Sequence, residues 1–138
     1  MRVQLPKSPM GIATVVVRVS FGVALLCVGL THYMAFGGFV TMAREGMGFL
    51  EPVAMLWAYI LPALMILGGA LFTIGMYAEI AAWAAGLALA SIPVGMLLRP
   101  VLSGVSMADV MPAAINAFIW LIVFVLVVRC WIGMENGE

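Results

Sequence analysis

Charged residues are scarce in this chain. They make up only 9% of its 138 residues, whereas hydrophobic residues make up 66%. A typical soluble domain is about a quarter charged, and it cannot hide this much apolar surface from water. The composition therefore excludes an ordinary soluble domain and indicates an integral membrane protein. The formal net charge is zero and no basic run occurs, so we expect no nucleic-acid partner.

Residues that hold metals or carry out covalent catalysis are equally few. His32 is the only histidine, so the chain cannot supply the two ligands of a bis-histidine haem or a multi-histidine metal site. Cys27 and Cys130 belong to different apolar segments and lack the close spacing of a metal or dithiol motif. A glycine-rich phosphate loop, a nucleophile elbow and paired catalytic carboxylates are also missing. We therefore expect no catalytic residue, no metal site and no cofactor held by this chain alone, and we leave a bound quinone or lipid open.

Four long apolar segments fill most of the chain, at about residues 11–34, 52–75, 79–98 and 110–131. Each is close to the roughly 20 residues that a helix needs to cross a hydrocarbon core about 30 Å thick. The first is too long for the apolar region of a signal peptide, which spans about 7 to 15 residues, so we expect it to be retained. The sequence therefore predicts an all-α fold, a single membrane domain over residues 1–138 built as an antiparallel bundle of four helices.

The segment after the first apolar run is too short and too charged to cross a membrane. Phe36-Gly37-Gly38 is expected to end the first helix, because glycines interrupt helices. The apolar residues of 39–50 recur at a helical spacing, which suits a short helix lying at the membrane interface. An irregular amphipathic loop is the alternative.

Turn and capping signals predict the ends of the later helices. Glu51 and Pro52 suit the N-cap and first turn of the second long helix. The turn at 75–78 is so short that the second and third long helices must touch. Ser106 and Asp109 resemble a capping box before the fourth long helix.

Small side chains mark the third long helix as a packing surface. Ala82, Gly86 and Ala90 repeat every four residues, as do Ala81 and Ala85. Such faces allow two helix backbones to approach closely in lipid. They favour helix–helix association as the main task of this segment.

Lysine and arginine near the ends of the spans predict the orientation, because cytoplasmic loops carry an excess of these residues. The larger group lies on the side of the termini and the smaller one on the opposite side, with Arg2, Lys7, Arg18 and Arg129 set against Arg44 and Arg99. We therefore expect both termini in the cytoplasm, with the protein in a bacterial inner membrane.

Arg18 is the one charge inside the first apolar run. A charge within a membrane span is costly and often functional. Arg18 lies about two turns, or roughly 10 Å, inside the terminal end, so its side chain can reach toward the headgroups or pair with Glu79. A structural anchor and a ligand contact both stay open for it.

The candidate contacts for a quinone or lipid are His32, Arg18, Trp57, Tyr59, Arg99 and Asn116. His32 is expected at the outer end of the first span, where a bond to backbone or water is the alternative to a ligand contact. Asn116 ordinarily makes an interhelical hydrogen bond in such a position. Trp57 and Trp131 also fit interfacial anchors.

A set of short motifs runs through about the first 90 residues. They are Arg18-x-x-x-Gly22, Gly29-Leu30-Thr31-His32, Gly46-Met47-Gly48-Phe49-Leu50-Glu51-Pro52 and Met65-Ile66-Leu67-Gly68-Gly69, with Gly75 after them. In these motifs the chain resembles the DoxX-like family, small four-helix membrane proteins that include the small subunit of thiosulfate:quinone oxidoreductase. The resemblance implies a subunit or partner of a membrane redox assembly. Two positions depart from the family pattern, His32 where Lys is frequent and Met65 where Glu is frequent, so the usual membrane carboxylate is missing.

Three functional hypotheses follow. The leading one is a small accessory subunit that packs against and stabilises a larger membrane complex, respiratory or redox in type, and contributes to a lipid or quinone pocket. The alternative is a quinone-reactive oxidoreductase subunit in which His32 bonds a quinone carbonyl. A small transporter ranks third, because the spans lack a polar midplane. The expected partners are membrane lipid and either a larger complex or further copies of the chain.

Overall fold

The computed structural model describes residues 5–137, and within this range the chain is helical and contains no strand. In chain order its elements are α1 (Pro9–Met34), α2 (Phe36–Arg44), the 3-10 turn η1 (Gly48–Leu50), α3 (Glu51–Ile74), α4 (Ala78–Ser103) and α5 (Met107–Glu135). The predicted all-α fold is confirmed for these residues.

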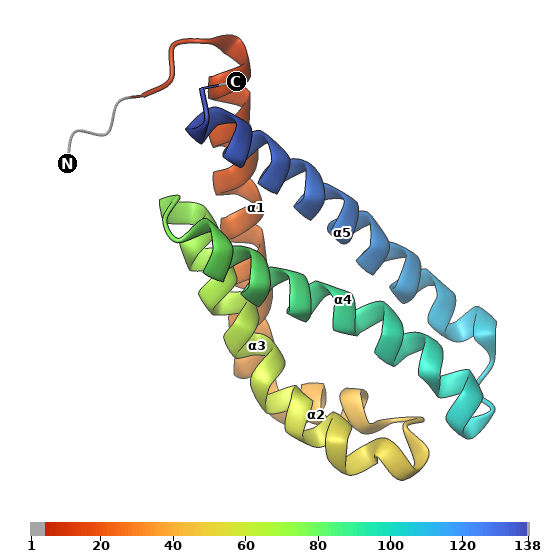
Figure 1. The fold of residues 1–138 in the computed structure, drawn as a ribbon. Coiled ribbons are helices and arrows are strands. Elements are labelled where there is room, and N and C mark those ends of the chain that lie inside the picture. The colour runs from red at the N-terminus through yellow and green to blue at the C-terminus, as the bar shows by residue number, and fades with distance from the viewer. Residues whose placement is uncertain (1–4, 138) are drawn as a thin grey trace.

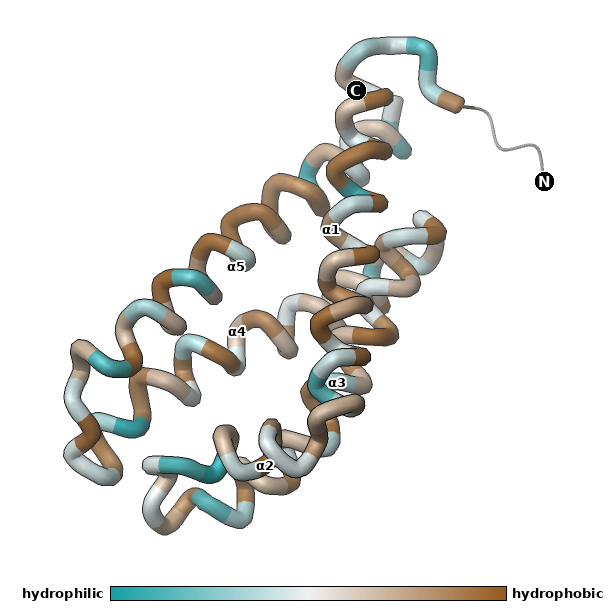
Figure 2. Tube along the Cα trace, turned by 180° about the vertical axis from the view of Figure 1, so that it is seen from behind, coloured by the Kyte–Doolittle hydropathy of each residue, from teal (hydrophilic) through white to brown (hydrophobic). Residues whose placement is uncertain are grey.

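Four of the helices, α1, α3, α4 and α5, are long and apolar enough to cross a membrane. The shortest of them, α3, has 24 residues, and at about 1.5 Å per residue it exceeds a hydrocarbon core about 30 Å thick. Figure 2 shows hydrophobic positions along most of these helices, while many of the hydrophilic ones gather in the segments that join them. Their length and composition indicate an integral membrane protein.

The long helices share one core. α1 packs along α3, α4 packs along α5, and α3 packs against α4, whereas α1 and α5 touch less (Figure 1). The largest fully buried side chains are Leu25, Pro62, Met65, Phe72, Leu89, Pro93, Val127 and Trp131. The two ends of the described chain lie together, because residues from 6–14 and 130–137 line one shallow groove.

Glycines bring α1 and α3 into backbone contact. A Cβ atom added at Gly22 would lie 2.6 Å from the Thr73 nitrogen, and one added at Gly69 would lie 2.6 Å from the Leu26 nitrogen. Real Cβ atoms do not approach backbone so closely, so only glycine fits at these two positions. Because lipid supplies no hydrophobic force between helices, such close packing is the main attraction between them.

The small residues of α4 face two different neighbours. Ala81, Ala85 and Ala88 are buried, and the Ala85 backbone lies 2.9 Å from the place where a Cβ of Gly68 would stand. The predicted contact between the second and third long helices is therefore confirmed. Gly86 instead faces Phe124 of α5, so this second row of small residues serves a different helix.

The helix after α1 begins earlier than expected. The break lies at Ala35, and Gly37 and Gly38 are part of α2, so the prediction that Phe36-Gly37-Gly38 is the break is wrong. Both glycines have open space around them, so no tertiary contact requires them to leave the helix. The short helix predicted over residues 39–50 is confirmed as far as Arg44, and the remainder consists of a turn and the 3-10 turn η1.

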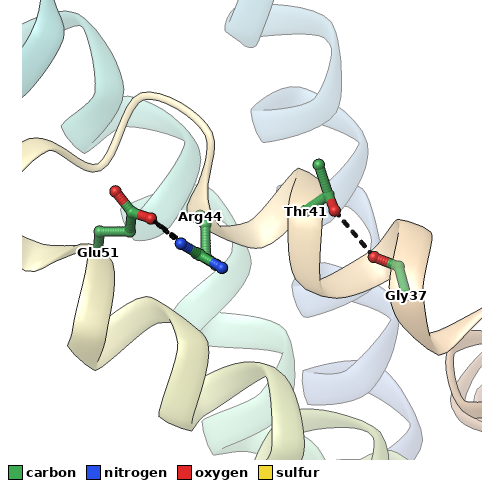
Figure 3. Close-up of polar contacts among 4 residues, drawn as sticks. All are labelled: Gly37, Thr41, Arg44 and Glu51. Carbon is green, nitrogen blue, oxygen red and sulfur yellow. Dashed lines mark hydrogen bonds and ion pairs between the residues drawn. The ribbon is translucent and has the colours of Figure 1, made fainter.

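Two predicted capping arrangements also differ from the structure. Leu50 is the N-cap of α3, and Glu51 is its first residue, whose carboxylate forms an ion pair with Arg44 (Figure 3). Ser106 is the N-cap of α5 as expected, but its side chain makes no capping bond; the Asp109 N–H donates to the Ser106 carbonyl at 3.0 Å instead. The local sequence pattern therefore predicted the starts of α3 and α5, but not the hydrogen bonds that cap them.

The third long helix does not end at 98. It continues through Pro93 and Pro100 to Ser103, where Gly104 takes a left-handed conformation with φ of 66°. Packing against neighbouring helices lets a membrane helix tolerate the hydrogen bonds that prolines remove. The turn before this helix is short, as predicted, with Gly75 closing α3 at φ of 71°.

Candidate functional site

A cavity of about 250 Å³ lies between the four long helices. Its lining comes from every one of them: Leu25, Val28 and His32 of α1, Met65 of α3, Leu89 and Ile92 of α4, and Ala113, Asn116, Ala117 and Trp120 of α5. His32, Asn116 and the Trp120 indole are the polar groups of this lining, and the rest is apolar. The cavity therefore combines a mostly apolar wall with a few hydrogen-bonding groups, which is the usual make-up of a small-molecule site.

His32 enters the cavity wall from the last turn of α1. Its ring stacks on Phe39 of α2, with the ring centroids 4.1 Å apart and the planes inclined by 15°. No described residue forms a hydrogen bond with its side chain, so the expected bond to the backbone is not formed. Because ring nitrogens point outward in the plane of the ring, a stack on one face leaves both free to bond a ligand.

Asn116 approaches the same cavity from α5. The interhelical hydrogen bond expected for its amide is not formed with any described residue. Asn116 is exposed, so the amide meets the cavity or lipid rather than a neighbouring helix. His32 and Asn116 are thus two unpaired polar side chains, from helices far apart in sequence, that line one cavity.

Met65 completes the uncharged wall of the cavity and is only 2% exposed. His32 and Met65 lie in separate sequence motifs of different helices, and the fold brings both to the same cavity. No residue of the lining carries a formal charge when His32 is neutral. Such a wall suits an uncharged ligand, because burying an unpaired charge is costly.

Trp57 and Tyr59 lie outside the cavity. The Trp57 indole N–H donates to the Ser91 hydroxyl at 2.8 Å, which ties α3 to α4. Tyr59 is 54% exposed, and its backbone carbonyl accepts a bond from the Tyr33 hydroxyl at 2.7 Å. The structure therefore gives both residues a packing role and does not bring them to His32.

Arg18 also lies away from the cavity, near the turn between α3 and α4. It is 9% exposed; its Nη1 donates to the Phe72 carbonyl at 2.9 Å, and its guanidinium carbon lies 5.2 Å from the centre of the Trp131 ring. The expected pairing with Glu79 is wrong, since the ion pair found within residues 5–137 joins other side chains. The side chain is buried against α3 and α5, and its guanidinium reaches the last turn of α3. Trp131 is 2% exposed, so the prediction of an interfacial anchor is wrong for it.

Arg99 contacts the segment between α1 and α3 instead of the cavity. Its Nη2 donates to the Met42 carbonyl of α2 at 2.6 Å, and the nearby Ser103 hydroxyl donates to the Gly46 carbonyl at 2.5 Å. On the other side of this segment, Arg44 pairs with Glu51 of α3 (Figure 3). Polar bonds therefore fasten α2 and the loop after it to both α3 and α4.

The sequence does not predict Trp120 in the cavity lining or Phe39 beside His32, and it predicts Met65 as a motif position but not as a cavity residue. The helical spacing of residues 39–50 predicts that Phe39 turns toward the protein, but it does not say that His32 is the neighbour. Trp120 lies one turn beyond Asn116 on α5, so the periodicity of that helix places the two on one face. That spacing is the signal that identifies Trp120 from sequence.

No protein-family model, no curated protein and no solved structure matches this chain.

Proposed function

We propose that the protein is a small accessory subunit of a larger membrane complex of respiratory or redox type, to which it contributes a pocket for an uncharged amphiphile, a quinone or a lipid. The observation that carries the proposal is the cavity between the four long helices, with His32 and Asn116 unpaired in its wall. A quinone offers carbonyl acceptors to the imidazole N–H and the Asn116 amide, and an apolar ring and tail to Leu25 and Met65. Among residues 5–137 no group of three or more metal-binding side chains occurs, so the proposal assigns any redox centre to a partner protein.

The membrane arrangement is part of the same proposal. The chain forms an antiparallel bundle of four helices in a bacterial inner membrane, with both termini in the cytoplasm. Support comes from the neighbouring ends of α1 and α5 (Figure 1), with Lys7 and Arg129 toward that side. Arg44 and Arg99 lie toward the opposite side and are engaged by Glu51 and by a backbone carbonyl. Arg2, which the sequence also assigns to the side of the termini, lies outside the described residues.

Membership of the DoxX-like family is also proposed. The motif glycines Gly22, Gly68 and Gly69 stand where α1, α3 and α4 approach most closely, which gives the resemblance a physical reason. His32 and Met65, the two positions that depart from the family pattern, both line the cavity. The support for membership therefore comes from the glycine contacts, and the departures concern the pocket.

Ligand binding is tested with the purified protein in lipid nanodiscs and decylubiquinone as the probe. We expect saturable quenching of tryptophan fluorescence, because Trp120 lines the cavity. His32→Leu and Asn116→Leu each remove one hydrogen bond and are expected to weaken binding about tenfold or more. Tyr59→Phe, which changes an exposed ring outside the cavity, is the matched control. Equal affinity in all four proteins would exclude the cavity as the binding site.

The accessory role is tested separately by extraction from the membrane in a mild detergent followed by native mass spectrometry. We expect the chain to leave the membrane in a complex with other subunits. A purely monomeric species without partners would contradict an accessory subunit, while leaving the binding experiment to decide the pocket.

A quinone-reactive subunit is the second candidate, favoured by the two unpaired polar groups in one cavity. In this case His32→Ala impairs electron transfer by the intact complex, although the complex still assembles. Unchanged turnover with normal assembly would favour the accessory role, in which the pocket holds a structural lipid.

A further inference from the structure

The short helix α2 reaches the cavity through one side chain. Phe39 is the buried residue of α2, 7% exposed, and it packs into the core. Its ring covers one face of the His32 imidazole, with 4.1 Å between centroids and nearly parallel planes. The residue thus touches the site without being part of the cavity lining.

This stack restricts the plane of the imidazole, because a ring turned out of parallel would lose its contact with the Phe39 face. No hydrogen bond from residues 5–137 holds the His32 side chain, so nothing else of that kind sets its rotation about the Cβ–Cγ bond. When Phe39 covers one face, the edge carrying the two nitrogens keeps one direction, and His32 belongs to the cavity wall in that orientation. Without the phenyl ring the imidazole gains rotational freedom, which a ligand must then remove on binding.

Bonds remote from the cavity hold Phe39 in place. The single residue Ala35 joins α2 to α1 and keeps its first turn close to the end of α1, whereas the far end of α2 is held by polar bonds. Arg99 binds the Met42 carbonyl near the end of α2, Ser103 binds the Gly46 carbonyl just beyond it, and Arg44 pairs with Glu51. These bonds dock α2 on α3 and α4, and none of them involves a residue of the cavity lining.

We propose that Phe39 is a positioning residue for His32, and that the docking of α2 sets the affinity of the cavity for its amphiphilic ligand. The first half concerns the protein alone. The second half rests on the proposed function, because it needs a ligand that binds His32. The occupant expected to respond is an uncharged ring compound that accepts a hydrogen bond.

The positioning role is tested by NMR of the imidazole, which is unambiguous because His32 is the only histidine. In the wild-type protein we expect the ring protons of labelled histidine to be displaced upfield by the Phe39 ring current, because the two rings are stacked. Phe39→Leu keeps an apolar side chain but removes the ring, so the displacement is lost. Phe39→Tyr restores the ring and the displacement. An imidazole spectrum unchanged by Phe39→Leu would overturn the positioning role.

The effect on binding is measured with decylubiquinone in the same nanodiscs. Phe39→Leu is expected to weaken binding about two- to tenfold, the cost of ordering one freed side chain, and Phe39→Tyr to restore it. A binding constant that is unchanged although the ring-current displacement is lost would overturn the link between α2 and the cavity. If the wild-type protein binds no probe, the proposed function fails, and the histidine spectrum alone still decides the role of Phe39.

Arg99→Gln tests the remote docking bonds. Loss of the bond to Met42 loosens α2, so we expect the imidazole displacement to shrink and decylubiquinone affinity to fall in the direction of the Phe39→Leu variant. Arg129→Gln removes an exposed cation of α5 that makes no described bond, and it serves as the matched control. A full displacement and full affinity in Arg99→Gln would show that docking does not control the site.

Discussion

At the scale of single residues, Arg18 joins three helices at one point. The Phe72 carbonyl lies in the last turn of α3, where backbone acceptors lack intrahelical partners, and the Arg18 guanidinium supplies the missing donor. Trp131 of α5 covers the cation from another side, with 5.2 Å between the guanidinium carbon and the ring centre. In a hydrocarbon environment an unsatisfied carbonyl costs several kcal/mol. The bond from Arg18 to the Phe72 carbonyl therefore stabilises the end of α3.

Gly75 allows this arrangement, because a Cβ there would lie within 2 Å of the Arg18 guanidinium and the residue has φ of 71°. We expect Gly75→Ala to lower the free energy of unfolding by about 2–4 kcal/mol, from left-handed strain plus overlap with the guanidinium. In an Arg18→Met background the overlap is gone, and the cost of Gly75→Ala falls to about 1–2 kcal/mol. The double-mutant cycle is measured by unfolding in detergent micelles. The same cost in both backgrounds would mean that the two residues do not interact.

At the scale of elements, the sequence predicted the four long helices correctly, because each coincides with a long apolar run. A run of about 20 apolar residues has few alternatives in a membrane, so the four long helices could be predicted. The boundaries of α1 and α3 and the start of α4 lie within two residues of the predicted ones. The glycine rule failed at Gly37 and Gly38, which remain helical in open space. The end of α4 could not be predicted, because Pro100 is accommodated within the helix.

The candidate site, too, could be predicted only in part. His32 and Asn116 were predicted as ligand contacts and line one cavity, whereas Arg18, Trp57 and Arg99 have other partners. Which face of a helix meets which neighbour is set by its rotation. Here that rotation follows from glycine contacts between helices far apart in sequence. A periodic pattern groups residues on one face but does not name the helix opposite.

Two glycines with opposite surroundings test the packing of these elements. Gly69→Ala places a methyl group against the backbone of α1, and we expect a loss of about 1–3 kcal/mol of stability through separation of the helices. Gly38→Ala meets open space within α2 and is expected to stabilise the protein by about 0.5–1 kcal/mol. Thermal unfolding followed by circular dichroism in one detergent compares the two variants. A neutral Gly69→Ala would contradict the close contact between α1 and α3.

At the scale of the whole molecule, the polar groups are divided between the two ends of the long helices. The ends of the described chain lie together on one side, and the docked segment formed by α2 and η1 lies on the other (Figure 1). His32 lies in the part of the cavity near α2. Arg18, with its partners Phe72 and Trp131, lies near the turn between α3 and α4, toward the other end of the long helices. A ligand and a partner that recognise the α2 side would both meet Arg44, Glu51 and the exposed part of α2.

The proposed orientation gives a further expected result. A green fluorescent protein fused to the C-terminus should fluoresce, because it folds in the cytoplasm, whereas alkaline phosphatase fused there should be inactive. Alkaline phosphatase inserted at 104–105, between α4 and α5, should be active. The reverse pattern would place both termini outside. Termini on opposite sides of the membrane would contradict four crossings.

The position of Trp131 has a consequence for biosynthesis. Arg18 emerges from the ribosome with the first helix, its carbonyl partner Phe72 follows with α3, and the indole that covers it arrives near the end of translation. Until then the cation is only partly shielded from lipid or from the insertion machinery. A chain that stops before Trp131 therefore lacks the indole that covers the Arg18 guanidinium. We expect such a truncated chain to be less stable than the full-length chain, which a comparison of their lifetimes in cells would test.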